Sequence, residues 1–298
     1  MSGQLKEVRE RIKSVKSTQQ ITKAMKMVSA AKLRKAQDAI VALRPYSDKL
    51  DQMLRNILSN IEGDASSSFG QERPVEKILI VPVTSSRGLC GAFNANIVKE
   101  ASKLIAQFDD VRKAGNLTIM PLGKKGYDGT KNKFKDCTFI TDHIEIFSDL
   151  SFDNVSTVSI NLMQEFTEGT YDKIYVTYGR FKNAALQFAE AVQFLPVEKI
   201  EAKGEMQESK LKADYIFEPS KEELLENLIP SILQTTFQKF LLDTNASEHG
   251  ARMTAMDKAT ENAEEIVKDL KISYNKARQE AITKELSEIV GGAAALGG

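Results

Sequence analysis

The pattern of hydrophobic positions in residues 250–298 predicts a long helix with a coiled-coil seam. Residues 251–290 contain no proline and no glycine, and good helix formers dominate. The seam residues follow at alternating steps of three and four, and they are Met253, Met256, Thr260, Ala263, Val267, Leu270, Tyr274, Ala277 and Ala281. Small and amide residues occupy other faces, and residues 291–298 are apolar and uncharged. Such a helix can be contacted from several sides.

A second long helix is predicted for residues 3–61. One heptad phase carries mostly apolar side chains near both ends, at Leu5, Val8, Ile12 and Val15, and again at Leu33, Ala36, Ile40, Leu43, Ser47, Leu50, Leu54, Ile57 and Ile61. Between these runs the same phase meets polar residues, which are Gln19, Thr22, Lys26 and Ser29, while the apolar positions shift to Ile21, Met25, Val28 and Ala31. We expect residues 19–31 either to turn a different face inward or to serve a different partner. Pro45 predicts a kink or a restart.

The two terminal helices are predicted to pair with each other. A helix of residues 3–61 would be roughly 85 Å long at 1.5 Å per residue, which no compact domain of this chain could cover. Ser220 and Glu223 form a capping box before a second helix that runs to Val290, with Pro230 in an early turn. Because the two helices lie at opposite ends of the chain with a compact domain between them, we expect antiparallel pairing.

The middle of the chain predicts an open, Rossmann-like α/β sheet with its core at residues 75–196. Apolar runs predict strands at 77–84, 117–122, 171–181 and 186–195, helical spacing recurs at 93–108 and 153–168, and a turn at 123–126 leads into a short helix. We therefore expect an α/β domain plus a long antiparallel coiled coil. The domains are an N-terminal coiled-coil helix (1–62), an α/β domain with its linkers (63–213) and a C-terminal coiled-coil helix (214–298).

Composition describes an ordinary globular protein, with 42% hydrophobic and 28% charged residues and no net charge. Residues 1–60 nevertheless hold 13 Lys and Arg against 5 Asp and Glu, a net charge of +8. A basic helix of this kind could meet RNA, anionic lipid or an acidic protein surface. No stretch reaches the length needed to span a bilayer, and the charged N-terminus does not fit a secretory signal.

Candidate chemistry in the sequence is sparse. The turn at 87–91, Arg-Gly-Leu-Cys-Gly, lacks both the GxGxxG of a dinucleotide site and the GxxxxGK of a P-loop. Cys90 and Cys137 are expected to be buried thiols in a reducing compartment, and His143 and His249 have no companions at metal-ligand spacing. The acidic residues of the C-terminal helix are expected on a solvated face, and they are Glu261, Glu264, Glu265 and Asp269. The sequence predicts no catalytic residues, no metal and no cofactor.

Three stretches together resemble the gamma subunit of F-type ATP synthases. Residues 21–33 (ITKAMKMVSAAKL) are similar to the family's N-terminal signature, and residues 85–96 (SSRGLCGAFNAN) to its central motif. The C-terminal signature is matched from ARMTAM at 251–256 through YNKARQ at 274–279 to ITKELSEIVGGA at 282–293. The resemblance covers the whole chain, although residues 63–74 and 196–213 match little, and the paired cysteines of redox-regulated chloroplast gamma subunits are not evident.

The resemblance implies a rotor shaft without catalytic activity of its own. The terminal helices would form a coiled coil inside a ring of three alpha and three beta subunits, and rotation would bias the catalytic sites between open and closed states. The resemblance places Met25, Lys26 and Met27 near a beta-subunit lever, and Arg252, Arg278, Gln279 and Thr283 at hydrogen bonds to a beta-subunit catch loop. It places Tyr215 and Glu218 at the foot, near the c-ring and the epsilon subunit.

Other implications concern location and surface chemistry. No cofactor and no nucleic acid is implied, and the complex would hold the chain peripherally at the cytoplasmic face of the bacterial inner membrane. Small residues on the C-terminal helix would let a ring approach closely, and an apolar tip at 293–296 would suit an apolar sleeve, because a charge there would be costly to desolvate. The alternative for the tip is a frayed tail. Acidic beta levers would account for the basic N-terminal helix.

Two other classes of function remain open on the residues alone. One is a dinucleotide-binding α/β enzyme with coiled-coil arms, which saturable nucleotide binding would support. The other is a static coiled-coil adaptor with a nucleotide-binding-like α/β domain, or a nucleic-acid binder that uses its basic helix. Co-purification with ATPase subunits or with RNA would distinguish these from a rotor.

Overall fold

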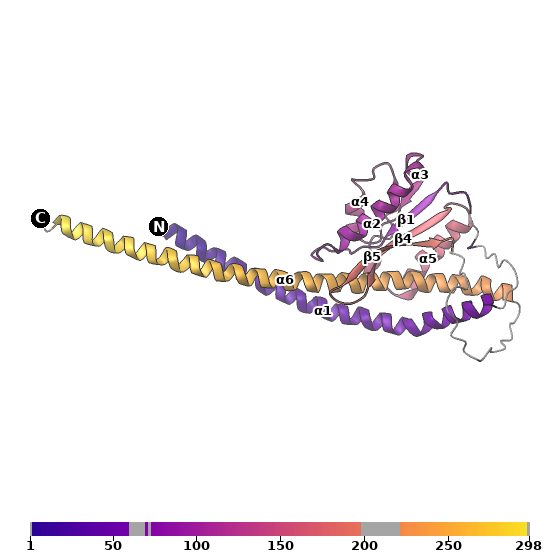
Figure 1. Ribbon diagram of the computed structural model, residues 1–298, viewed down its shortest axis with the longest axis horizontal. Coiled ribbons are helices and arrows are strands. Elements are labelled where there is room, and N and C mark those ends of the chain that lie inside the picture. Colours follow the sequence, from indigo (N-terminus) through magenta and orange to yellow (C-terminus); the bar gives the residue numbers. More distant parts are fainter. Residues whose placement is uncertain (1, 60–68, 71–72, 198–220, 297–298) are drawn as a thin grey trace. The chain divides into compact units, whose positions relative to one another are not determined.

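The computed structural model describes residues 2–59, 69–70, 73–197 and 221–296. The two predicted long helices are confirmed as α1 (Ser2–Ser59) and α6 (Lys221–Leu296), which pack together (Figure 1). The chain forms two compact units. The first combines residues 1–30 with 252–298, and the second comprises residues 31–251.

In the first unit, the predicted seam of α6 is confirmed. Every seam residue from Met253 to Ala281 is buried or half-buried, whereas every other residue between 261 and 280 is exposed. Two side-chain contacts link the helices, Thr22 with Thr260 and Lys26 with Asp257. Since the residue number rises on α1 while it falls on α6, the pairing is antiparallel, as predicted.

The middle of the α1 pattern resolves the choice that the sequence left open. Thr22 and Ser29 are only 8% and 3% exposed, whereas Ile21 and Val28 are 60% and 57% exposed. The helix therefore keeps its heptad phase, so the first alternative, a different face turned inward, is wrong, and the second, a different partner for these residues, stays a prediction. The physical reason is that Thr22 and Lys26 find partners on α6, so that Ile21 and Val28 remain outside.

The C-terminal part of α6 continues past the end of α1. α1 starts at Ser2, which is 20 residues before Thr22. Because Thr22 contacts Thr260 and the helices are antiparallel, Ser2 lies level with about residue 280 of α6. Residues 282–292 are all exposed, and Figure 1 shows the yellow end of α6 extending beyond the N-terminus. The helix runs through Gly291 and Gly292 to Leu296, six residues beyond the predicted end.

The second unit contains the predicted α/β sheet. Its strands are β1 (Ile78–Pro82), β2 (Leu117–Ile119), β3 (Thr138–Phe139), β4 (Lys173–Phe181) and β5 (Gln187–Leu195). They lie in the order β3-β2-β1-β4-β5, with β5 antiparallel to β4 and the other pairs parallel. Only β3, with two residues, was not predicted. Every residue of β1 is buried, because the strand is covered on both faces.

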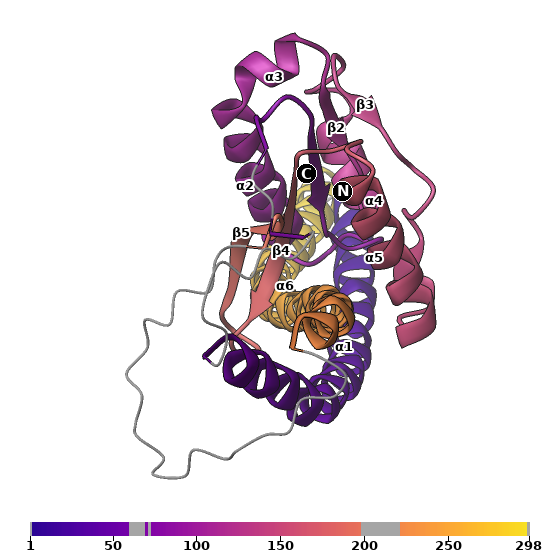
Figure 2. The same ribbon diagram turned by 90° about the vertical axis from the view of Figure 1, so that its right-hand side faces the viewer.

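Helices cover both faces of the sheet, and they are α2 (Phe93–Gln107), α3 (Asp109–Lys113), α4 (Lys124–Thr130), α5 (Phe152–Thr167) and the short 3-10 helix η1 (Ile146–Ser148). Ile78 and Ile80 pack with Ala101 and Ile105 of α2. Leu79 and Val81 point the other way, into a core shared with α5 and with the part of α6 around Phe237. Figure 2 shows α2 and α5 on opposite sides of the sheet. Within the second unit, this part of α6 therefore packs directly against the sheet.

Neither proline inside the long helices interrupts them. α1 continues through Pro45, so the restart allowed by the sequence is not found. Pro45 is exposed, and a carbonyl that loses its intrahelical partner on the solvent side can bond to water. Pro230 is the tenth residue of α6, in an early part of the helix, as expected.

Candidate functional site

The turn after β1 is held together by its own polar groups. The Asn94 amide donates to Ser85 Oγ at 2.7 Å and to Cys90 Sγ at 3.1 Å, and its Oδ1 accepts from the Ser85 backbone amide at 3.0 Å. Cys90 is buried. These three side chains hydrogen-bond to one another and so hold the shape of the turn.

Cys137 differs from the sequence expectation. The thiol is free, as predicted, but it is only half-buried, because β3 lies at the edge of the sheet. Burial, with a smaller effect of the Asp136 carboxylate, raises the pKa of Cys137 to about 11. The thiol is therefore protonated at neutral pH and weakly nucleophilic.

The described residues contain no group of three or more His, Cys, Asp or Glu side chains placed to hold a metal ion. The acidic residues Glu261, Glu264, Glu265 and Asp269 are exposed, as predicted. Among the described helices, none combines the length and apolar character needed to cross a membrane.

A buried carboxyl group lies in the second unit where α1, β4 and α6 meet. Asp243 is 7% exposed and lines a cavity of about 220 Å³ together with Arg44, Arg180 and Lys239. Desolvation raises the pKa of Asp243 to about 6, against the attraction of Lys239, Arg180 and Arg44, in decreasing order. Arg180 Nε donates to Glu190 at 2.6 Å. Sequence reasoning missed this group, although Asp243 stands alone in an uncharged run, FLLDTNAS.

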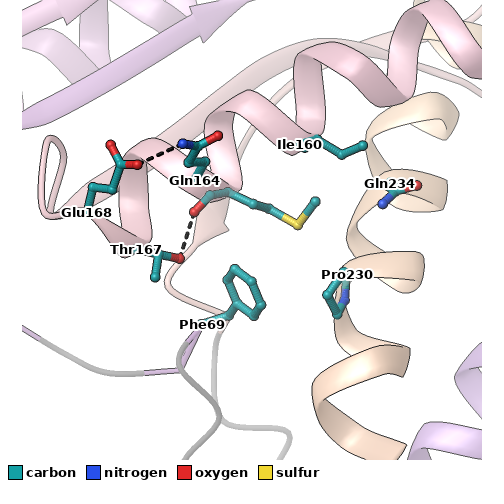
Figure 3. A pocket seen from close by; sticks show the side chains of 8 residues that line it. Phe69, Ile160, Gln164, Thr167, Glu168, Pro230 and Gln234 are labelled. Atoms are coloured by element: carbon teal, nitrogen blue, oxygen red, sulfur yellow. Dashed lines mark hydrogen bonds between the residues drawn. The ribbon is translucent and has the colours of Figure 1, made fainter.

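A second, open pocket of about 380 Å³ lies between α5 and α6 in the same unit (Figure 3). Phe69, Ile160, Met163 and Pro230 give it an apolar lining. Two of its polar side chains already have hydrogen bonds, since the Gln164 amide donates to Glu168 at 2.7 Å and Thr167 Oγ1 donates to the Met163 carbonyl at 2.8 Å. Glu168 is the one carboxyl group among these lining residues, and no His, Cys or Lys stands beside it.

The structure does not bring the three N-terminal candidates to one face of the coil. Met27 is 67% exposed and Met25 is half-buried, whereas Lys26 turns toward α6 and bonds to Asp257. Exposed Ile21 and Val28 extend the outward apolar surface around Met27. We call Ile21, Met27 and Val28 the outward face of α1. Ile21 and Val28 appear in the sequence as the shifted apolar positions.

The C-terminal candidates also separate. Arg278, Gln279 and Thr283 are exposed neighbours on α6, whereas Arg252 is 9% exposed and lies 26 residues earlier, about 39 Å along the helix. An exposed apolar stripe accompanies the first three, at Ile282, Leu286, Ile289 and Val290. The seam positions that would follow Ala281 carry Lys284 and Glu288, an ion pair at 4.0 Å. The apolar stripe therefore lies on a different face of α6 from the coiled-coil seam. Tyr215 and Glu218 lie outside the described residues.

Comparisons with known proteins agree with this architecture. A family model described as ATP synthase matches residues 4–296. The ATP synthase gamma chain of Cytophaga hutchinsonii is 51% identical over 98% of both chains, and that of Christiangramia forsetii is 53% identical over 99% of both chains. A chain in the solved mitochondrial ATP synthase of Euglena gracilis (OSCP/F1/c-ring, rotational state 3) shares the fold, with a TM-score of 0.66 and 23% identity over 99% of this chain and 95% of that one. With half of its residues identical to these relatives over nearly the full length, the chain belongs to the ATP synthase gamma chains, the non-catalytic central rotor subunits of F-type ATP synthase.

Proposed function

We propose that the coil of residues 1–30 and 252–298 turns inside a ring of alpha and beta subunits, and that its contacts with each beta subunit in turn bias the catalytic sites. The observation that carries this proposal is the position of the apolar residues. A two-helix coil normally buries its large apolar residues between the helices. Four such residues are nevertheless exposed here, and they are Ile21, Val28, Leu286 and Ile289. Exposed apolar surface of this kind indicates a protein partner.

The two apolar surfaces lie at different heights of the coil and on different helices. The outward face of α1 lies level with Thr260 and Asp257, since Thr22 and Lys26 contact these residues. The stripe at 282–290 begins near the height at which α1 starts, at Ser2. A ring that encloses the coil would cover both surfaces, whereas a partner that binds one side of the coil would cover only one.

The named contacts form part of the same proposal. Met25 and Met27 would meet a beta-subunit lever, and Arg278, Gln279 and Thr283 would donate hydrogen bonds to a beta-subunit catch loop. Exposed donors next to an apolar stripe suit such a capture contact, because they lose little when water is replaced by a partner's acceptors. Arg252 would act at a separate height, about 39 Å away along α6.

The remaining partners follow from membership of the family. The α/β domain, with Tyr215 and Glu218 nearby in sequence, would meet the epsilon subunit and the c-ring. The chain would be held at the cytoplasmic face of the bacterial inner membrane through the complex, without nucleic acid or a cofactor of its own. Its domains would divide at residues 62 and 213.

Reconstitution with alpha and beta subunits tests the proposal. We expect a complex of three alpha, three beta and one copy of this chain, with ATPase activity that depends on the chain. The double variant Leu286→Ser with Ile289→Ser should weaken assembly, and the matched control Ile266→Ser, which changes an exposed residue outside both surfaces, should assemble normally. ATPase activity that does not depend on this chain would contradict the proposed contacts with alpha and beta subunits. Recovery of the chain with RNA instead of ATPase subunits would contradict them as well.

A further inference from the structure

Two polar contacts follow each other between the helices of the first unit. Thr22 Oγ1 and Thr260 Oγ1 are 2.8 Å apart, and one turn further along α1 the Lys26 ammonium donates to Asp257 Oδ1. The two α1 residues are four apart and the two α6 residues three apart, as expected for successive rungs of an antiparallel coil. Thr22, Lys26 and Thr260 occupy seam positions, which apolar residues normally fill.

The hydrogen bonds of the threonine rung restrict each other. Thr22 Oγ1 also lies 3.0 Å from the Gln19 carbonyl, and Thr260 Oγ1 lies 2.7 Å from the Met256 carbonyl. Each hydroxyl has one proton, so one threonine donates to the other, which donates to its own helix. The arrangement requires both hydroxyl groups at this height and at this rotation of the helices.

Polar rungs specify register more sharply than apolar rungs do. Apolar contact is non-directional, so an apolar seam can slip by a turn and still bury similar surface. A slip by one turn would leave Lys26 and Asp257 without each other. A rotation of α1 by one residue, about 100°, would carry Ile21 and Val28 inward and Thr22 and Ser29 outward.

We propose that the Lys26–Asp257 ion pair, assisted by the Thr22–Thr260 contact, locks the register and rotation of α1 against α6, so that Ile21, Met27 and Val28 face the surrounding ring. This inference rests on the proposed function, because it assigns a purpose to the outward face of α1. Lys26 is then a positioning residue within the shaft and not a direct beta-subunit contact.

The strength of the ion pair depends on its surroundings. The side chains of Lys26 and Asp257 are 40% and 45% exposed in the chain alone, and exposed pairs contribute little because water competes with them. A ring that covers the outward face of α1 would exclude water from the pair and strengthen it. The ion pair would therefore hold the register of α1 against α6 more firmly in the part of the coil that the ring covers.

Register can be measured in the full-length chain by cross-linking. In a chain with Cys90 and Cys137 changed to serine, the variant Thr22→Cys with Thr260→Cys places two thiols where the hydroxyl oxygens are 2.8 Å apart. We expect rapid disulfide formation, slowed about fivefold by Lys26→Asp, the factor for a pair worth about 1 kcal/mol. Adding Asp257→Lys should restore the rate, and Lys26→Arg should preserve it. Lys26→Asp with Glu265→Lys keeps the net charge but places the new lysine two turns away, so the rate should stay low.

The positioning role is tested in the complete ATP synthase, including its membrane part, reconstituted in closed vesicles with the threonines and cysteines unchanged. We expect Lys26→Asp to lower the ratio of ATP-driven proton pumping to ATP hydrolysis, a ratio that does not depend on how much complex assembles. The charge swap with Asp257→Lys should restore the ratio. If Lys26 contacted a beta subunit directly, the swap would not restore it, and the proposal would be wrong.

The remaining outcomes separate the two proposals. An unchanged cross-linking rate in Lys26→Asp would overturn the lock itself. A changed rate with an unchanged pumping ratio would overturn its role in positioning. A wild-type chain that fails to support ATPase activity would instead remove the proposed function, and the cross-linking result would still report on the register.

Discussion

Asp243 is predicted to destabilise the folded chain at neutral pH, and Asp243→Asn should relieve this cost. In the unfolded chain the carboxyl loses its proton near its ordinary pKa of 3.8, whereas desolvation raises the pKa to about 6 in the folded chain. Because the folded state binds this proton more tightly, stability is lost as the pH rises from about 4 to 6, and the loss is complete above that range. A shift of about two units corresponds to roughly 3 kcal/mol.

The neutral amide of Asn resembles the protonated carboxyl, so the variant should avoid this cost. We expect its gain in stability to be near zero below about pH 4, to grow up to about pH 6 and to stay constant to pH 8. For a unit of this size the gain is worth about 5 °C or more in thermal midpoint. Near-ultraviolet circular dichroism can follow the transition, because Tyr171, Tyr175 and Tyr178 all lie in the second unit and the chain has no tryptophan.

Two further variants sharpen this test. Asp48→Asn removes an exposed carboxylate that lines the same cavity and should change the midpoint little at any pH. Lys239→Ala removes the largest attraction to the ionised carboxylate and should lower stability at pH 8. A stability gain in Asp243→Asn that does not vary with pH would contradict the raised pKa. A loss of stability at pH 8 would show that the ion pairs with Lys239, Arg180 and Arg44 outweigh desolvation.

Three other predictions follow from single residues. Gly179→Ala would place a Cβ atom 2.5 Å from Phe93 Cε2, so urea denaturation should show a loss of roughly 1–3 kcal/mol; an unchanged midpoint would mean that the ring moves aside freely. Met25→Lys should lower the ratio of proton pumping to ATP hydrolysis by adding a charge beside acidic beta-subunit groups, and unchanged rates of both would count against the placement of Met25. Alkylation of Cys137 should be slow at pH 8 and rise steeply toward pH 11, and rapid labelling at pH 7 would disprove its raised pKa.

The parts of the fold that depend on local periodicity could be predicted from the sequence. The seam from Met253 to Ala281 and the buried strand at 78–82 are patterns in which each residue's neighbours along the chain determine its environment. β3 escaped prediction because two residues at a sheet edge carry no such pattern. The burial of Asp243 also escaped prediction, because it depends on α1 and β4, which are distant in sequence.

The inward face of α1 at residues 19–29 shows a different limit. The sequence revealed that polar and apolar positions had exchanged, but the hydrophobic pattern alone favoured no choice between a rotated helix and a second partner. The rotation of α1 depends on residues more than 200 positions away. Thr260 hydrogen-bonds to Thr22, and Asp257 hydrogen-bonds to Lys26. The candidate beta-subunit contacts at Met25, Met27, Arg278, Gln279 and Thr283 stay predictions, because they concern other chains.

The end of α6 offers a last prediction about the free chain. Residues 282–292 are helical, yet they have no α1 residues opposite them, and a single helix of such length is marginally stable in water. We therefore expect their backbone amides to exchange with deuterium rapidly in the free chain and to become protected when alpha and beta subunits assemble around the coil. Residues 263–281, whose seam is buried against α1, serve as the control and should be protected before assembly as well. Equal exchange of residues 282–292 in both states would show that no ring closes around this end, and the apolar stripe at Ile282, Leu286 and Ile289 would then need another partner.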